Sequence, residues 1–95
     1  MTEPVELLLP GALADVAGGE RRLLVDPPPP SVSALLDEVA RTHPALARRV
    51  RDETGALRRY VNVYVDGEDV RALDGIATPL RPGSQVHVLP SVAGG

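Results

Sequence analysis

Hydrophobic and polar residues alternate in the second half of the chain, a pattern that is typical of strands with one buried face. Over residues 58–65 the alternation turns Val61, Val63 and Val65 toward the core, and it recurs over residues 84–89. We therefore expect two strands with Val61, Val63, Val65, Val86 and Val88 inward. Their opposite faces would carry Tyr60, Asn62, Tyr64, Gln85, His87 and Leu89.

Turn signals separate these two strands. Asp66 and Gly67 both tolerate positive φ and favour a tight hairpin turn, so residues 68–70 should begin a return strand. The Arg-Pro-Gly sequence at residues 81–83 should turn the chain into the last strand. Pro90 should end that strand, because proline lacks the N–H group that a hydrogen-bonded ladder needs.

The first half combines two aliphatic runs with one amphipathic helix. Residues 5–9 and 22–26 predict a hairpin with a wide loop. Ser31 is a good N-cap, Pro44 should stop the helix that follows, and residues 45–50 should form a further helical turn. The hydrophobic stripe of the main helix consists of Val32, Leu35, Leu36, Val39 and Ala40.

Four consecutive prolines at residues 27–30 lie between the hairpin and the helix. Prolines cannot donate backbone hydrogen bonds or enter a central strand, so this run is interpreted as a stiff connector. A polyproline ligand for an SH3-like partner is the alternative interpretation.

Two strands, a crossing helix and several further strands predict an α+β fold of the β-grasp, or ubiquitin-like, type. In this fold a small mixed sheet has one main helix packed on one face. We expect residues 1–90 to form the domain and residues 91–95 to form a flexible tail that ends in two glycines.

Composition and charge narrow the possible functions. The 13 Leu, 13 Val and one Ile are enough for a folded core, whereas Tyr60 and Tyr64 are the only aromatic residues. Base stacking has almost nothing to use, and a net charge of -3 also argues against binding nucleic acid. The longest apolar stretch is broken by Pro10 and Gly11 and stopped by Asp15, so we expect neither a signal peptide nor a membrane span.

The sequence contains no recognisable catalytic or metal site. It has no Cys, which excludes disulfides and thiolate sites, and a cytoplasmic location fits this composition. His87 has no obvious carboxylate partner, and the acidic residues between positions 66 and 74 lack the oxygen spacing of a calcium loop. We therefore expect the chain to bind no metal or cofactor of its own.

The sequence ends in Ser91, Val92, Ala93, Gly94 and Gly95, small residues that cannot anchor themselves by burial. Six extended residues from Pro90 onward can span about 20 Å, far enough to enter the active-site channel of another protein. Glycine lacks a Cβ atom and so fits a narrow channel. The ending predicts a segment that a partner grips.

Four segments resemble the ubiquitin-like sulfur-carrier family, which includes the small subunit of molybdopterin synthase and the thiamine-pathway sulfur carrier. The segments are residues 59–65, 68–71, 75–78 and 86–95, the last of which reads Val-His-Val-Leu-Pro-Ser-Val-Ala-Gly-Gly. The likeness is greatest to the actinobacterial carrier of cysteine biosynthesis. It covers residues 58–95 well and the first half of the chain by topology.

The resemblance implies a carrier that acts as the co-substrate of other enzymes. An adenylyltransferase of the ubiquitin-activating type, using ATP and magnesium, would adenylate the Gly95 carboxylate, and sulfur from a persulfide or sulfide would replace AMP to give a thiocarboxylate. A sulfur-accepting synthase would then use the sulfur, in first place for cysteine and otherwise for thiamine, molybdopterin or a specialised metabolite. A peptidase that recycles the carrier is a further possible partner.

Specific residues follow from this interpretation. Ala93 and Gly94 would thread the partner's channel, and the chain alone is expected to be a monomer. The partner-docking residues are predicted to be Tyr60, Asn62, Tyr64, His87, Leu89 and Val92.

Two other classes of function share these features. A ubiquitin-like modifier joined through Gly95 to lysines of target proteins would have the same fold, tail and activation step. A plain binding module would have a tail that is incidental to its function.

Overall fold

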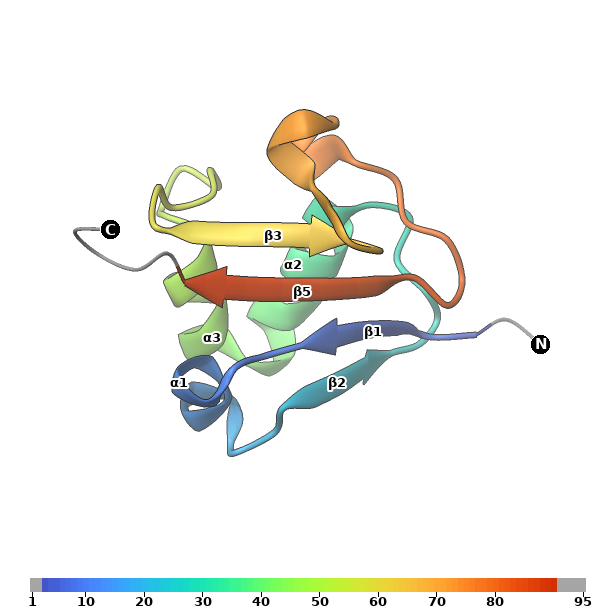
Figure 1. The fold of residues 1–95 in the computed structure, drawn as a ribbon. Helices are drawn as coiled ribbons and strands as arrows, with labels where there is room; N and C mark the ends of the chain where they lie inside the picture. Colours follow the sequence, from blue (N-terminus) through green and yellow to red (C-terminus); the bar gives the residue numbers. More distant parts are fainter. Residues whose placement is uncertain (1–2, 91–95) are drawn as a thin grey trace.

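The computed structural model describes residues 3–90, which form one five-stranded mixed sheet (Figure 1). The strand order is β2-β1-β5-β3-β4, and only β1 and β5 run parallel. Strands β1 and β5 are neighbours in the middle of the sheet, so the first and last strands of the chain lie side by side. The strands are β1 (Val5–Leu8), β2 (Arg22–Val25), β3 (Val61–Val65), β4 (Glu68–Asp69) and β5 (Gln85–Pro90).

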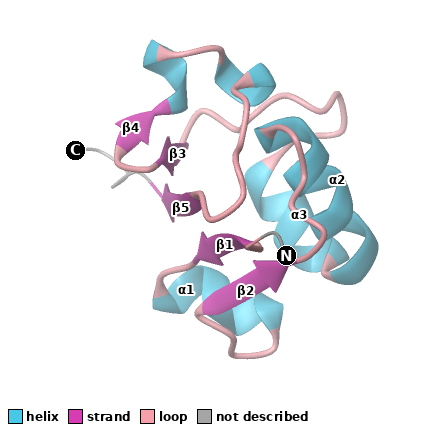
Figure 2. Cartoon of the chain, turned by 90° about the vertical axis from the view of Figure 1, so that its right-hand side faces the viewer, coloured by secondary structure: helices cyan, strands magenta, loops and turns pink. Residues whose placement is uncertain are grey.

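Two helices cover one face of this sheet, α2 (Val32–Thr42) and α3 (Pro44–Val50) (Figure 2). The hydroxyl oxygen of Ser31 accepts a hydrogen bond from the Ala34 N–H at 3.1 Å, which caps α2 as predicted. Helix α2 ends just before Pro44, and Pro44 is the first residue of α3. Proline is tolerated at that position because the N–H group of a first helical residue has no hydrogen-bond partner within the helix. The predicted helical turn after Pro44 is therefore a seven-residue helix.

Aliphatic side chains from the sheet and the helices form a single core. The inward positions of β1, β3 and β5 are buried, as the alternation predicted. Ala40 is exposed, so the predicted helical stripe ends one residue earlier, at Val39. The fully buried large side chains are Leu7, Leu35, Leu36, Leu46, Val5, Val32, Val50, Val61, Val63, Val70, Val86 and Val88.

The predicted wide loop between β1 and β2 is instead largely helical. It contains α1 (Gly11–Ala14) and the 3₁₀ turn η1 (Asp15–Ala17). Leu13, Ala14 and Ala17 are buried there and extend the core beneath the sheet's end. The aliphatic residues of this segment form a helix too short for a periodic pattern to be recognisable in the sequence.

Strand β3 is shorter than the sequence predicted. It begins at Val61 and not at residue 58, because residues 59–60 form a turn that is closed by the Val61 N–H donating to the Arg58 carbonyl at 3.1 Å. Pro90 ends β5, as predicted, and is itself the last paired residue of that strand, opposite Val61. A proline is tolerated there because it is the terminal position of the strand.

The return strand after the Asp66-Gly67 turn has only two residues. The Asp69 carboxylate accepts a hydrogen bond from the Arg71 N–H at 2.8 Å and starts the 3₁₀ turn η2 (Val70–Ala72), so Val70 is buried in that turn and does not extend β4. A second 3₁₀ turn, η3 (Gly75–Ala77), follows and leads back toward the helix.

The proline run is fixed against the body of the molecule. Pro29 is buried, and the Pro30 carbonyl accepts a hydrogen bond from the Leu80 N–H at 2.9 Å. The Thr78 carbonyl accepts another from the Val32 N–H at 3.0 Å, at the start of α2. These contacts fit the interpretation of residues 27–30 as a spacer.

Candidate functional site

Four of the predicted docking residues lie together on the sheet face opposite α2 and α3, here called the outer face. Asn62 on β3 pairs with Leu89 on β5, and Tyr64 pairs with His87. Directly opposite residues in an antiparallel pair have their side chains in contact range. Asn62, Tyr64, His87 and Leu89 thus form one continuous patch, which we call the docking surface.

The docking surface is partly open to solvent. Leu89 is 40% exposed, while Asn62, Tyr64 and His87 are half-buried. An accessible patch on a sheet that combines an aromatic and an aliphatic side chain with polar neighbours is the kind of surface that proteins use for interfaces.

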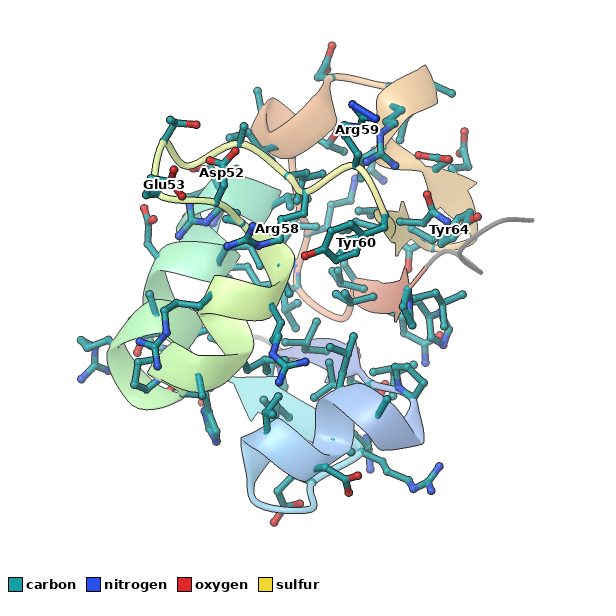
Figure 3. The ribbon with its side chains drawn as sticks, turned by 90° about the vertical axis from the view of Figure 1, so that its left-hand side faces the viewer. Asp52, Glu53, Arg58, Arg59, Tyr60 and Tyr64 are labelled. Atoms are coloured by element: carbon teal, nitrogen blue, oxygen red, sulfur yellow. The ribbon has the colours of Figure 1, made fainter. Side chains whose placement is uncertain are left out.

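Tyr60 lies outside β3, contrary to the alternation, which placed it on the strand beside Asn62 and Tyr64; its docking role stays a prediction. It lies in the turn before β3, at the end of the sheet, and is 55% exposed (Figure 3). In that view Tyr64 lies on the outer face, whereas Tyr60 lies nearer the loop that carries Arg58. A shallow hollow of about 260 Å³ is lined there by Asp52, Leu57, Arg58, Arg59 and Tyr60.

Leu8 is a neighbour of the docking surface that the sequence interpretation missed. It lies on β1 directly opposite His87 and is half-buried. Its signal was available: Val5, Leu7 and Leu9 are the inward positions of the first run, so Leu8 must face outward. Leu7, Leu8 and Leu9 are consecutive aliphatic residues, which hides that alternation.

Arg71 fixes the start of β3. Its guanidinium donates to the Asn62 side-chain oxygen at 2.9 Å, to the Val61 carbonyl at 2.8 Å and to the Arg58 carbonyl at 3.2 Å. A planar guanidinium with several fixed donors can bridge three acceptors in this way. Arg71 therefore holds the Asn62 side chain and the start of β3 in one arrangement.

The loop between α3 and β3 is held by local hydrogen bonds. The Asp52 carboxylate accepts from the Thr54 hydroxyl at 2.5 Å, from the Thr54 N–H at 2.8 Å and from the Ala56 N–H at 3.2 Å. These bonds, that of the Thr54 hydroxyl first, hold the pKa of Asp52 below its usual value. Arg58 closes the loop by donating to the Arg48 carbonyl at 2.7 Å.

Glu6 links three strands beside the docking surface. Its carboxylate accepts from the Gln85 amide on β5 at 3.0 Å and from Arg22 Nε on β2 at 2.5 Å. The Gln85 hydrogen bond first, and the Arg22 hydrogen bond second, lower the pKa of Glu6.

The predicted tail residues lie outside the described residues. These are Ser91, Val92, Ala93, Gly94 and Gly95. The described chain reaches Pro90, which is exposed and lies at the same end of the sheet as the start of β3.

Residues 3–90 include no cluster of three or more His, Asp or Glu side chains that could hold a metal ion. In the same part of the chain, every buried side-chain nitrogen or oxygen has a hydrogen-bond partner. No helix there is both long and apolar enough to cross a membrane.

Comparison with solved structures defines the class of the fold. The chain superposes on the crystal structure of CysO from Mycobacterium tuberculosis with a TM-score of 0.82, at 30% identity, over 93% of this chain and 99% of that one. It is also similar to a chain of the BexX/CysO complex of Amycolatopsis orientalis, with a TM-score of 0.81 and 35% identity over 96% and 99% of the two chains. The architecture is thus the β-grasp fold of ubiquitin-like proteins, as predicted.

Sequence comparison gives the family. The ThiS family matches residues 7–95. The sulfur carrier protein CysO of Mycobacterium tuberculosis is 33% identical over 93 residues, which cover 96% of this chain and 98% of the relative. The chain belongs to the ThiS family of ubiquitin-like sulfur carriers, in agreement with the resemblance found in the sequence.

Proposed function

We propose that this chain carries sulfur as a thiocarboxylate on Gly95, and that the sulfur is used in cysteine biosynthesis. The observation that carries the proposal is the ThiS family match, which extends through the two final glycines. The relative named sulfur carrier protein CysO, similar over nearly the whole chain, supports the same assignment.

The chemistry begins with an unreactive group. A terminal carboxylate has a pKa of about 3.3 to 3.7, so at neutral pH it is ionised and a poor electrophile. In the proposed first step, a Gly95 carboxylate oxygen bonds to the α-phosphorus of ATP and pyrophosphate leaves. The product is an acyl-adenylate, and a partner enzyme that binds ATP and magnesium would catalyse its formation.

Sulfur enters in the second step. Hydrosulfide attacks the carbonyl carbon of the acyl-adenylate, the bond to AMP breaks, and the product is a thiocarboxylate. Where a persulfide is the donor, its terminal sulfur attacks first, and a second thiol must then reduce the sulfur–sulfur bond. The thiocarboxylate sulfur is the nucleophile that an acceptor enzyme would use.

The carrier contributes recognition and positioning to this scheme. In our proposal the docking surface binds the activating enzyme, while Ala93 and Gly94 pass into its channel. Only small residues without long side chains fit such a channel, and glycine also adopts backbone angles that other residues avoid. The carrier itself supplies no catalytic group.

The residues that the chain lacks also suit this role. It contains no Lys and no Cys, so few of its own groups can attack the activated Gly95 ester. The N-terminal amine is the exception among strong nitrogen nucleophiles. The need for ATP and reduced sulfur leads us to assign the chain to the cytoplasm.

The proposed chemistry requires partner proteins. A CysO chain has been crystallised in the BexX/CysO complex of Amycolatopsis orientalis. We propose an activating enzyme, a sulfur-accepting synthase and a recycling peptidase as partners for this chain. Sulfur delivery to thiamine, molybdopterin or a specialised metabolite remains the alternative to cysteine.

Intact-protein mass spectrometry on the chain isolated from its native host tests the proposal. We expect a form in which one terminal oxygen has been replaced by sulfur, and a fragment spectrum that places the change at Gly95. The same spectrum establishes whether Gly95 is the last residue of the mature protein. A host extract with an active cysteine pathway and only the unmodified mass would contradict the proposal.

A protein modifier is the second candidate, and two relatives favour it. Small archaeal modifier protein 3 of Haloferax volcanii is 38% identical over 65 residues, 68% of this chain and 70% of that protein. The crystal structure of SAMP1 from the same organism matches with a TM-score of 0.79 and 33% identity over 96% of this chain. Higher-mass adducts on immunoblots, lost on deletion of Gly94-Gly95, would favour this function.

A further inference from the structure

Strand β2 is an open edge of the sheet. It pairs with β1 on one side, and no strand of the described residues pairs with its other side. The Leu9 N–H donates to the Arg21 carbonyl at 2.9 Å, so the backbone of Arg21 faces β1. Backbone direction alternates along an antiparallel ladder, which turns the N–H and C=O groups of Arg22 and Leu24 to the open side.

A large apolar side chain lies in the middle of this edge. Leu24 is 55% exposed, on the same face of the sheet as Glu6 directly opposite it. Proteins usually protect an edge strand with charge, proline or a bulge, because an unpaired edge with apolar residues recruits another strand. The sequence around Leu24 carries opposite charges on either side, Arg22 before it and Asp26 after it.

We infer that β2 is a self-association edge, where a second copy of this chain adds its own β2 in the antiparallel direction. In the pairing that we propose, Leu24 lies opposite Leu24 of the second copy. Arg22 then lies opposite Asp26, and by symmetry Asp26 lies opposite Arg22. Strand β2 ends at Val25, so the Leu24 pair would exchange backbone hydrogen bonds, and the two flanking pairs would bring the opposite charges of Arg22 and Asp26 together.

Alternative registers are less favourable. A slip of one residue turns the side chains of one strand to the wrong face. The two-residue slip in one direction brings Glu20 opposite Asp26, and the slip in the other direction brings Arg22 opposite Pro28, which has no N–H to donate. A self-complementary charge pattern with one favourable register is an argument for a second copy as the occupant.

The existing contacts of Arg22 are compatible with this pairing. Its Nε atom is used by Glu6, but the side chain is 61% exposed and its terminal nitrogens have further donors. Asp26 is exposed and directly follows β2. An arginine fork can contact a carboxylate on each side, Glu6 within the chain and Asp26 of the second copy.

The paired form leaves the docking surface accessible. Strand β1 separates β2 from β5, so the new strand is added on the far side of the sheet from Tyr64 and Leu89. An antiparallel pair also places the two Pro90 residues at opposite ends of the joined sheet. A contact this short lies at the weak end of protein interfaces, so the proposed pair should form only at high protein concentration.

Cysteine cross-linking tests the register directly, because the chain has no cysteine of its own. In a hydrogen-bonded antiparallel pair the two Cα atoms at position 24 lie about 5.5 Å apart, within the range of a disulfide. We expect Leu24→Cys to form disulfide-linked dimers under mild oxidation about tenfold faster than Leu73→Cys, since pairing raises the effective concentration of the thiols. Leu73 is an exposed leucine away from this edge and serves as the matched control.

Arg22→Cys is the second control. It lies on the same edge, but the proposed register separates the two thiol positions by four residues, about 13 Å, so it should cross-link slowly. Equal rates for Leu24→Cys, Arg22→Cys and Leu73→Cys would mean random collision and would overturn the inference.

A charge change gives an independent measurement. Asp26→Arg in the Leu24→Cys background places like charges opposite each other and should slow cross-linking several-fold, and added Arg22→Asp should restore the rate. Circular dichroism would verify that each variant is folded. Cross-linking unaffected by Asp26→Arg would refute the proposed register, and this result is independent of whether Gly95 carries sulfur.

Discussion

Pro90, the last residue of β5, is paired with Val61, the first residue of β3. The carbonyl group of Val61 also accepts a hydrogen bond from the Arg71 guanidinium at 2.8 Å. The sheet therefore holds the chain up to the residue that immediately precedes the predicted tail. Variants in the tail, the docking surface and the sheet consequently have separable effects.

The tail is predicted to determine activation without determining stability. Gly95→Ala should slow ATP–pyrophosphate exchange with the activating enzyme at least about tenfold, which corresponds to 1.4 kcal/mol, because a methyl group crowds the channel. Deletion of Gly94-Gly95 should abolish exchange. Thermal unfolding should be nearly unaltered for both, and exchange at the normal rate by Gly95→Ala would count against the steric argument.

The docking surface is predicted to supply binding energy. Tyr64→Ala and Leu89→Ala should each weaken binding to the activating enzyme by about 1 to 2 kcal/mol, as loss of a central interface side chain does. Isothermal titration calorimetry measures this change. Leu73→Ala is the control, because Leu73 is about as exposed as Leu89 but lies outside the docking surface. Equal affinity for the parent chain and all three variants would exclude the docking surface from the interface.

Arg71 is predicted to organise the start of β3. Arg71→Lys keeps the charge but loses the planar fork that bridges Asn62, Val61 and Arg58. We expect a loss of about 1 to 2 kcal/mol in unfolding free energy, in line with the loss of hydrogen bonds to a charged donor. Amide hydrogen exchange at Val61 and Asn62 should accelerate more than exchange in α2, and uniform acceleration would argue against a local role.

The core is predicted to depend on the packing of α2 against the sheet. Leu35 is fully buried, so Leu35→Ala should cost about 2 to 5 kcal/mol of unfolding free energy through lost burial and a residual cavity. Urea denaturation measures it. Leu73→Ala should stay within about 0.5 kcal/mol of the parent protein, because substitutions at exposed positions rarely matter more.

The carboxylate of Glu6 is predicted to make stability depend on acid pH. Gln85 and Arg22 lower its pKa in the folded state from the usual 4.5, so its contribution is fully present above that value. The contribution is lost as the pH falls through the lowered folded pKa, because the folded state then binds a proton at a cost. Glu6→Gln should therefore reduce the loss of stability on acidification from about pH 5 to about pH 3.

Urea denaturation at both pH values provides the comparison. Gln at position 6 cannot titrate, and the remaining carboxylates are common to both proteins. An identical loss of stability in Glu6→Gln and in the parent chain would show that Glu6 does not contribute to acid sensitivity.

The sequence was most informative where the periodicity had a single interpretation. The alternation of Val61, Val63 and Val65 correctly predicted an inward face, and Ser31 and Pro44 correctly marked the ends of the main helix. Alternation did not reveal Leu8, because Leu7 and Leu9 on either side of it are also aliphatic. The family resemblance, carried by residues 58–95, agreed with the β-grasp type that the order of elements indicated, but the order of strands in the sheet was not predicted.

Departures from the predictions have local physical causes. Tyr60 is not part of β3, because the Val61 N–H donates to the Arg58 carbonyl and closes a turn around residue 60. Arg71 donates further hydrogen bonds to the carbonyl groups of Arg58 and Val61. Asp69 ended β4 early by capping the next turn. Arg71 reaches the Arg58 and Val61 carbonyls across 13 and 10 residues of sequence, so these contacts form only once the chain has folded. The Asp69 cap is local, but a pattern of alternating hydrophobic and polar residues does not register it.

The position of β5 has a mechanical consequence. It is flanked by β1 on one side and β3 on the other, and it runs parallel to the first strand of the chain. A pulling force applied beyond Pro90 acts along β5, so its lateral bonds to both neighbours must shear together and cannot be peeled away one at a time. A machine that unfolds proteins by drawing in their last residues would thus find this domain hard to unravel.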